Sequence, residues 1–369
     1  MEEIKLNQAW FHRLKAASSI LVTGLAAVSA VMLLAPHVAT AAGGGLYVPN
    51  LANVAEFQGR IKNGKKPHRV NRSGDIESGN AIAFDPNGNI WVTNFDGDSI
   101  IAFTRAQFRA AKGKRSAPTA IVKISQDGGA NLAGPEGIAF DSAGTMWVGS
   151  EHGQEVLAYS PAQYAASGSP TPNVILNANS FNFSSPSNVV FDSAGNLWVV
   201  DENIANGNGG TGQIFRYNRA QVSGLSPGTH HIDPAFGIGF QNFAHLEGFA
   251  FDNSGNAWIA DESTDSLYRF SRSQLGGSGL SNNLSPTVTL GFAGTGGPCS
   301  HSIDNPYGVA VSSSGDLIVA NAVNSTACHG SLAVFSAAAI NSDGTPSPRA
   351  FISNGAISAP GYLTFGPTL

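Results

Sequence analysis

One two-strand pattern recurs six times along this chain, and the sixth copy is divided between the two chain ends. Four copies are near-identical, with an apolar strand, an Asp-x-x-Gly turn and a second strand containing Trp: 81–92, 137–148, 188–199 and 248–259. The fifth copy, 308–319, lacks the Asp and the Trp. The sixth has its first strand at 362–365 and its second at 45–48. A repeat completed only by joining both ends predicts a closed ring. We expect an all-β six-bladed β-propeller over residues 44–369, with its N- and C-terminal strands paired.

The repeated side chains have a structural interpretation. The turn Asp can accept backbone amide hydrogens, and the Gly three residues later tolerates positive φ. Large residues at one position of the second strand would pack blade against blade: Trp91, Trp147, Trp198 and Trp258, with Tyr47 and Ile318 in the other two blades. A third strand, a short helical turn containing Gln and a proline-led outer strand follow. Because a site residue rarely recurs in every blade, we interpret the repeated Asp, Trp and Gln as scaffold.

The Gly-x-Ala-Phe-Asp-x-x-Gly-Asn-x-Trp-Val pattern resembles the NHL-repeat group and the wider SMP-30/gluconolactonase and paraoxonase type of six-bladed propeller. The resemblance covers roughly residues 44–369. It implies the architecture. It leaves the activity open, because this fold hosts hydrolases, lyase-like enzymes and binding modules without catalysis.

The N-terminus differs from the rest of the chain. Basic residues, Arg13 among them, precede an apolar stretch over 20–35, and Ala39 and Ala41 occupy the −3 and −1 positions of a cleavage site. This layout predicts a secretory signal peptide over residues 1–41 and a secreted or periplasmic protein. The competing interpretation is an uncleaved membrane anchor, although the apolar stretch is short for a full span.

Composition narrows the class of partner. The chain combines 44 Gly with only 12% charged residues and a formal net charge of −5, which fits a compact all-β protein with many turns. No basic stripe is present, so nucleic acid is not an expected partner. We expect a monomer, with no membrane span after signal cleavage, that binds a small molecule or a protein.

The two cysteines, Cys299 and Cys328, fall in loops on the same face of the fifth blade. Their even number and the oxidising compartment that export supplies predict a disulfide. By closing this loop, the disulfide would stabilise the folded state by roughly 3–4 kcal/mol in the chain-entropy model. The alternative is a metal site with the adjacent His301 and His329, but this is not a common zinc spacing.

Ligands of propellers usually bind where the central channel opens, and one position of each first strand points there. Across the six blades that position holds Asn80, Glu136, Ser187, Glu247, Tyr307 and Gly361. The ends of the second strands add further polar residues, among them Asp201 and Asp261, followed in sequence by Glu202 and Glu262. We expect Tyr307, Asp201 and Asp261 to contact a ligand at this face.

Carboxylates and amides around one axis suit a hard cation such as calcium. The resembling lactonases hold a divalent ion with Glu, Asn and Asp at the channel mouth, and the matching residues here are Asn80, Glu136, Asn188 and Glu247. The match departs from the family pattern, because the order of acids and amides differs and Asn188 is offset by one. The alternative is that these side chains cap strand ends and line a solvated channel.

A hydrolase also needs a base or a metal-activated water. His245 lies two residues from Glu247 and is the candidate general base. Two functions remain open from the sequence. One is an exported propeller that binds a small molecule, sugar or protein at the channel mouth, and the other is a divalent-metal-dependent lactonase or ester hydrolase of the gluconolactonase type.

Overall fold

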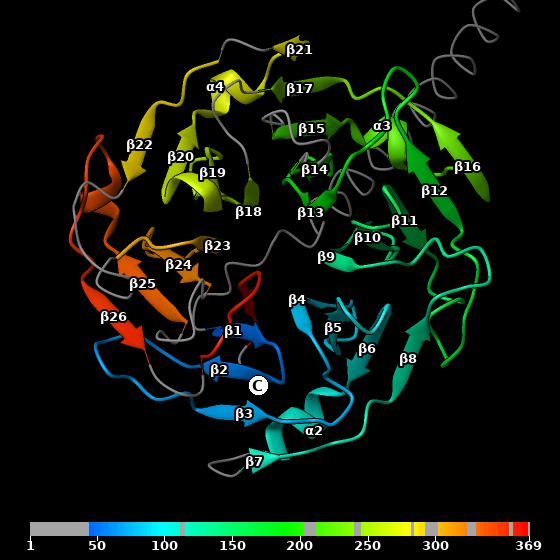
Figure 1. Ribbon diagram of the computed structural model, residues 1–369, viewed down its shortest axis with the longest axis horizontal. Helices are drawn as coiled ribbons and strands as arrows, with labels where there is room; N and C mark the ends of the chain where they lie inside the picture. The colour runs from blue at the N-terminus through cyan, green and yellow to red at the C-terminus, as the bar shows by residue number, and fades with distance from the viewer. Residues whose placement is uncertain are drawn as a thin grey trace, which may run out of the picture. The chain divides into compact units, whose positions relative to one another are not determined.

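The computed structural model describes residues 44–110, 115–202, 212–239, 245–281, 284–291, 302–322, 330–353 and 357–367. These residues form six β-sheets arranged as blades around a central axis, as Figure 1 shows. The predicted all-β, six-bladed propeller is therefore confirmed. The proposed signal peptide, Cys299 and Cys328 lie outside the described residues.

Each blade has four antiparallel strands, counted outward from the axis. The innermost are β4 (Gly79–Phe84), β9 (Pro135–Phe140), β13 (Pro186–Phe191), β18 (Leu246–Phe251), β23 (Pro306–Val311) and β27 (Thr364–Gly366). The second are β5 (Ile90–Asn94), β10 (Met146–Ser150), β14 (Leu197–Asp201), β19 (Ala257–Asp261), β24 (Leu317–Asn321) and β1 (Gly45–Asn50). The third are β6 (Ser99–Phe103), β11 (Glu155–Tyr159), β15 (Gln213–Tyr217), β20 (Ser266–Phe270), β25 (Ser331–Phe335) and β2 (Asn53–Phe57). The fourth are β8 (Val122–Ser125), β12 (Val174–Asn177), β17 (Phe236–Gly239), β22 (Val288–Gly291), β26 (Ala350–Ser353) and β3 (Arg69–Asn71).

In blades 1 to 3 the repeated Asp and Trp act together in the turn between the first two strands, whereas Nε1 of Trp258 in blade 4 has no hydrogen-bond partner among the described residues. In blade 1, Asp85 accepts from the backbone amide of Asn89 at 2.8 Å and from Nε1 of Trp91 at 3.1 Å. Gly88 completes the turn at φ +77°. The matching tryptophans of blades 2 and 3 donate to their own repeat Asp at 3.2 and 2.9 Å. The scaffold interpretation of these residues is confirmed, since each indole is buried against the next blade.

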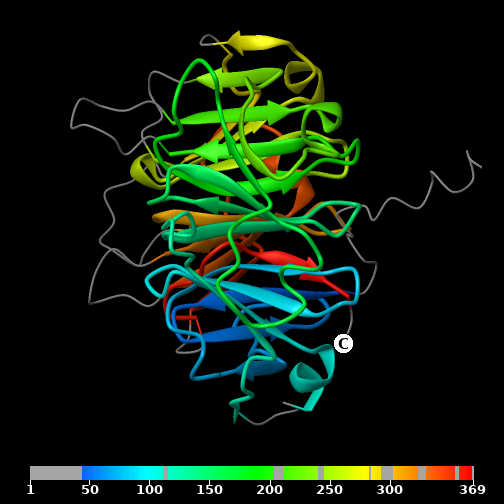
Figure 2. The same ribbon diagram turned by 90° about the vertical axis from the view of Figure 1, so that its right-hand side faces the viewer.

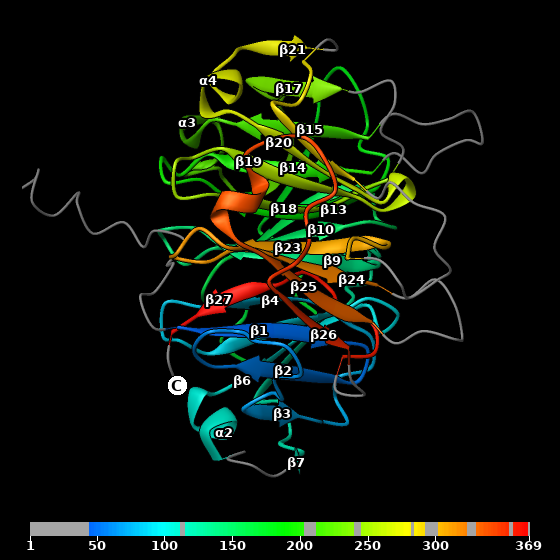
Figure 3. The same ribbon diagram turned by 90° about the vertical axis from the view of Figure 1, so that its left-hand side faces the viewer.

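Connections between third and fourth strands carry the short helices α2 (Arg105–Ala110), α3 (Arg219–Val222) and α4 (Arg272–Leu275), all on one face of the ring (Figures 2 and 3). In the second blade's connection, the carbonyl oxygen of the Gln163 side chain accepts from the amide of Ser160 at 2.9 Å. Its amide nitrogen donates to the carbonyl of Thr171 at 2.6 Å. Gln107, Gln221 and Gln274 make the same pair of bonds in their blades. The repeated Gln is thus also scaffold.

These connections also join neighbouring blades, which the sequence analysis did not predict. The short strands β7 (Arg115–Ser116), β16 (Gly228–His231) and β21 (Gly279–Ser281) pair in parallel with the outer strand of the preceding blade. Isolated parallel bridges, Ile124 to Gly168 and Leu290 to Gly344, do the same at two further joints. Each such pairing covers an outer strand that would otherwise be an open sheet edge.

Residues from the two ends of the described chain share one blade. β27 pairs antiparallel with β1, with Leu46 opposite Phe365. The apolar core consists of clusters between neighbouring blades, including one between blades 5 and 6. Within the described ranges, no helix is both long enough and apolar enough to cross a membrane.

Candidate functional site

Side chains from the innermost strands of three blades meet at the channel mouth. Asn80 on β4 donates through Nδ2 to Oε1 of Glu136 on β9 at 2.9 Å. The hydroxyl of Tyr307 on β23 donates to the same oxygen at 2.8 Å and accepts from Nδ2 of Asn80 at 3.0 Å. Three residues that the sequence analysis singled out therefore form one hydrogen-bonded group.

Tyr362, just before β27 of the sixth blade, extends this group to two more blades. Its hydroxyl donates to Oε2 of Glu247 on β18 at 2.5 Å and lies 3.3 Å from Oε2 of Glu136. Its ring stacks on Tyr307, with centroids 4.9 Å apart and an interplanar angle of 20°. Two carboxylates from different blades thus share one phenol.

The sequence analysis assigned this position of the sixth blade to Gly361 and missed Tyr362. The structure gives the reason for the glycine, because an added Cβ would lie 1.8 Å from the backbone oxygen of Asn80. The amide of Tyr362 donates to that oxygen at 2.8 Å. The close approach of the two strands requires glycine, and the next residue supplies the side chain that enters the channel.

Loop residues beside the inner strands add a second group. His245, directly before β18, lies between Glu202, which follows β14, and Glu262, the first residue of η1 (Glu262–Thr264). Its Nε2 is 3.1 Å from Oε2 of Glu202 and 3.7 Å from Oε1 of Glu247, and its Nδ1 is 2.9 Å from Oε2 of Glu262. Asn305 donates to the other oxygen of Glu262 at 2.6 Å. The two groups meet at Glu247.

The carboxyl groups of the channel mouth are buried and close to one another. Glu136 is 4% exposed and Glu247 is 2% exposed. Burial raises the pKa of Glu136 well above its usual range, and the charges of Glu202 and Glu151 add to the effect. Burial likewise raises the pKa of Glu247, and the charges of Glu202 and Glu136 raise it further. The site therefore favours neutralisation of its acids, by protons or by a cation.

His245 carries the positive charge of this region. Hydrogen bonds to Glu202 and Glu262 raise its pKa to about 10, against the opposing effect of burial. For Glu262, burial acts to raise the pKa, but the hydrogen bond and charge of His245 outweigh it and the pKa is lowered. Near neutral pH the ring is an imidazolium, which must lose a proton before it can act as a general base.

Three residues of the cluster fit a metal ion. Donor atoms of Glu202, His245 and Glu247 all lie within 4.8 Å of one another. Oε1 of Glu202 is buried and has no hydrogen-bond partner in the described part of the chain. A buried carboxylate oxygen without a partner is costly unless a cation or donor satisfies it. Carboxylate and imidazole together suit a divalent transition metal such as zinc, whereas calcium would use the carboxylate oxygens alone.

This set differs from the one expected from the sequence. Asn80, Glu136 and Glu247 belong to the tyrosine-linked group described above. Asn188 is buried on β13, one position beyond the aligned Ser187, and its side chain makes no hydrogen bond to another described residue. No sequence signal joined His245 to Glu202, because they belong to different blades and meet only in the folded ring.

The second-strand ends have a different environment from the one expected. The carboxylate of Asp201 accepts from the backbone amides of Ser184 and Ser185 at distances down to 2.7 Å. Asp261 accepts from the amide and hydroxyl of Ser263 at 3.1 and 2.7 Å. Both carboxylates hold adjacent loop backbone in place, and contact between them and a ligand stays a prediction.

Neither a protein-family model nor a curated protein matches the sequence. Among solved structures, a chain of a nidogen–laminin complex matches over 88% of this chain and 98% of its own length, at 15% identity and a TM-score of 0.55. A virginiamycin B lyase from Staphylococcus aureus matches at 12% identity and a TM-score of 0.43, over 79% and 80% of the two chains. A putative gluconolactonase matches at 12% identity and a TM-score of 0.44, over 70% and 74%. The match to the nidogen–laminin chain, at 15% identity and a TM-score of 0.55, supports the propeller fold alone.

Proposed function

We propose that this protein is an exported β-propeller that binds a divalent cation at its channel mouth and, at the same face, a small oxygen-rich ligand. The observation that carries the proposal is the convergence of donor atoms from Glu202, His245 and Glu247 within 4.8 Å, beside the buried Glu136. The ligand contacts the cation and the hydroxyls of Tyr307 and Tyr362, which line the same mouth.

Electrostatics give the physical reason for a cation. Buried carboxylates that converge repel one another unless they are protonated or a positive ion lies between them. Without the ion, the protonated ring of His245 supplies one positive charge, which Glu202 and Glu262 share. To act as a ligand, His245 must release the proton on Nε2 when the divalent ion binds. A divalent ion that binds only the folded state would also stabilise the fold by mass action.

The test is the melting temperature of the purified protein after chelation and after addition of calcium, zinc or manganese. Metal analysis of the untreated protein accompanies it. We expect at least one of these ions to raise the melting temperature, and we expect Glu202→Gln and Glu247→Gln to abolish the rise. Glu77→Gln is the matched control, because the Glu77 side chain is 53% exposed and lies outside the cluster. A protein that contains no metal and melts at the same temperature with and without these ions would contradict the proposal.

A metal-dependent lactonase or ester hydrolase is the second candidate. The observation that favours it is the position of His245, whose side chain is 32% exposed and lies 3.7 Å from Glu247. A bound divalent ion would polarise a carbonyl group and activate water. In this alternative, Glu202 and Glu247 would hold the ion, and His245 would stay outside the ligand set and hold or transfer a proton at Nε2. Assay of the metal-loaded protein against a lactone panel decides between the two, since the binding function predicts no turnover by the wild type or by His245→Gln.

Export and the cysteine pair complete the proposal. The basic and apolar pattern before Ala41 supports cleavage and a secreted or periplasmic location. N-terminal sequencing of the exported protein should begin at Ala42. Mass spectrometry without reduction should find Cys299 linked to Cys328, and size-exclusion chromatography should give a monomer. Free thiols at both cysteines would remove the disulfide and part of the argument for export.

A further inference from the structure

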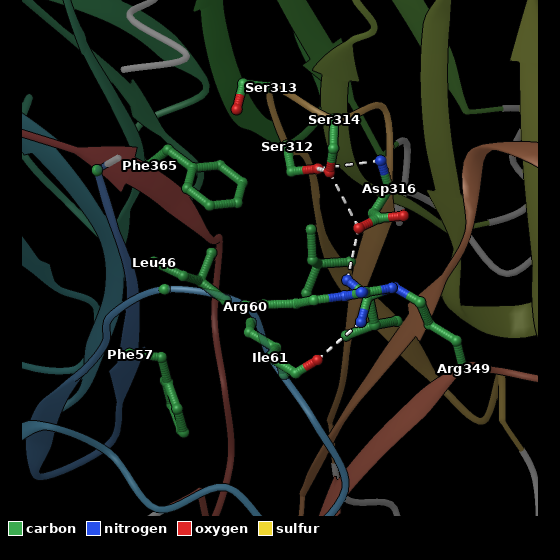
Figure 4. Close-up of a pocket in the computed structure, with 14 residues that line it drawn as sticks. Leu46, Phe57, Arg60, Ile61, Ser312, Ser313, Ser314, Asp316, Arg349 and Phe365 are labelled. Atoms are coloured by element: carbon green, nitrogen blue, oxygen red, sulfur yellow. Dashed lines mark hydrogen bonds and ion pairs between the residues drawn. The ribbon is translucent and has the colours of Figure 1, made fainter. Parts of the chain in front are cut away.

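A cavity of about 520 Å³ lies between blades 5 and 6, away from the channel mouth. Its apolar wall comes from both blades, and Figure 4 shows the side chains around it. The wall residues are Leu46, Phe57, Ile318, Val334 and Phe365. The turn over 312–316, which joins β23 to β24, closes one side. That turn is at the strand ends opposite to Pro306 and Asn321, so the cavity opens on the other face of the ring from the cation cluster.

Blade 5 lacks the Asp and the Trp of the repeat, and this explains the space between blades 5 and 6. In blade 1 the equivalent position holds Trp91, whose ring packs against Phe140 of the next blade with centroids 6.1 Å apart. Blade 5 has Ile318 in place of the tryptophan, and it faces Phe365, the equivalent of Phe140. Ser312 replaces the aspartate that would hold an indole. The missing ring leaves volume between two blades that are otherwise packed alike.

Charged groups line one end of the cavity. Arg349 pairs with Asp316 at 2.5 Å and donates through Nη1 to the carbonyl of Ile61 at 2.7 Å. Arg60 lines the cavity as well. Its guanidinium is on an exposed residue and makes no ion pair or hydrogen bond with any described residue. The lining therefore carries one more positive than negative charge, and Arg60 can receive an anion.

We propose that this cavity is a binding site for a small amphipathic carboxylate, with its apolar body between blades 5 and 6 and its carboxylate at Arg60. The volume falls within the range of roughly 300–1,000 Å³ that small-molecule pockets occupy. Apolar burial supplies affinity. The free guanidinium selects a carboxylate head over a neutral or cationic one, because it can bind both carboxylate oxygens.

Decanoate is the probe, used below its micelle concentration, with decanol and decylamine as neutral and cationic analogues of equal chain length. Calorimetry or displacement of a fluorescent fatty acid gives the dissociation constants for the purified full chain. We expect saturable binding of decanoate at least about tenfold tighter than of decanol, the size of effect that one charge-assisted contact gives. No saturable binding of decanoate, or equal binding of all three probes, would overturn the proposal.

Two variants locate the binding. Arg60→Gln removes the charge from an exposed residue and should bring decanoate to within about threefold of decanol, without change in melting temperature. Ile318→Trp restores the repeat residue and should abolish binding of all three probes while the protein stays folded. Glu247→Gln, at the other face, should leave decanoate binding unchanged. Full decanoate affinity in both Arg60→Gln and Ile318→Trp would place the ligand elsewhere and contradict the proposal.

Discussion

Blades 2 and 5 follow the same four-strand plan, yet one joint is filled and the other is hollow. In blade 2, Trp147 is 2% exposed and donates to Asp141 at 3.2 Å. In blade 5, Ile318 and Ser312 take these positions and a cavity of about 520 Å³ lies beside them. The difference shows that the repeated residues pack the blades together. Where blade 5 lacks the repeated Asp and Trp, space for a ligand is left between blades.

The channel mouth follows the same rule in another form. Its aligned inner-strand positions vary from blade to blade and include Asn80, Glu136, Glu247 and Tyr307. The repeated positions pack the blades together. The inner-strand positions that vary between blades place polar side chains around the channel axis.

Deletion of residues 360–369 should destabilise the whole ring. It removes β27, which pairs with β1, and two buried side chains, Tyr362 and Leu363. At about 1.5–3 kcal/mol for each buried side chain, the loss is roughly 3–6 kcal/mol before the exposed edge of β1 is counted. Thermal melting measures it, with deletion of residues 368 and 369 alone as the control. A truncated protein that melts at the parental temperature would show that the two ends do not close the ring.

Trp147→Ile should convert the filled joint of blade 2 into one like that of blade 5. It removes a buried indole and leaves Asp141 without that donor. We expect a loss on the order of 3 kcal/mol in urea unfolding, near the lower end of the range for large-to-small changes at buried aromatics. Ile318→Val is the comparison, at about 1 kcal/mol. Equal costs for the two changes would mean that the indole does not distinguish the joints.

The sequence predicts the blades and the positions that face the channel, but not which side chains contact one another across the axis. The spacing of the strands follows from the repeat, so the copy expected over 81–92 corresponds to β4 (Gly79–Phe84) and β5 (Ile90–Asn94). Channel positions such as Glu136 follow from the same alignment. Which side chains touch across the axis does not, because that depends on how six blades close. Tyr362 and the pairing of His245 with Glu202 therefore required the structure.

Gln163→Ala tests a uniform position at the surface. It removes the two hydrogen bonds that tie the helical turn of blade 2 to the segment before β12. We expect a loss of about 1–3 kcal/mol in the free energy of unfolding, at roughly 0.5–1.5 kcal/mol for each of the two bonds. Gln126→Ala is the control, since the side chain of Gln126 makes no hydrogen bond with another described residue. The matching change at Gln221 should cost about the same, and a large difference between the two would argue against equivalent roles.

The smallest expected effect is the change in stability caused by Glu155→Gln. It distinguishes a pKa shift caused by burial alone from one that depends on a bound cation. Glu155 on β11 is partly buried and away from the channel cluster. Burial raises its pKa, with the hydrogen bond from Asn177 opposing. Because the folded state holds this proton more tightly than the unfolded state, the contribution of Glu155 to wild-type stability falls as pH rises above the ordinary value of 4.5. Glu155→Gln should therefore gain on the wild type as pH rises above 4.5, by less than about 1 kcal/mol, since the group is only partly buried. Urea unfolding across this range measures the gain, with and without the divalent ions. If the difference is the same in both conditions, Glu155 reports burial alone, in contrast to the channel residues. A difference that changes with the ions would show that their effect is not confined to the channel mouth.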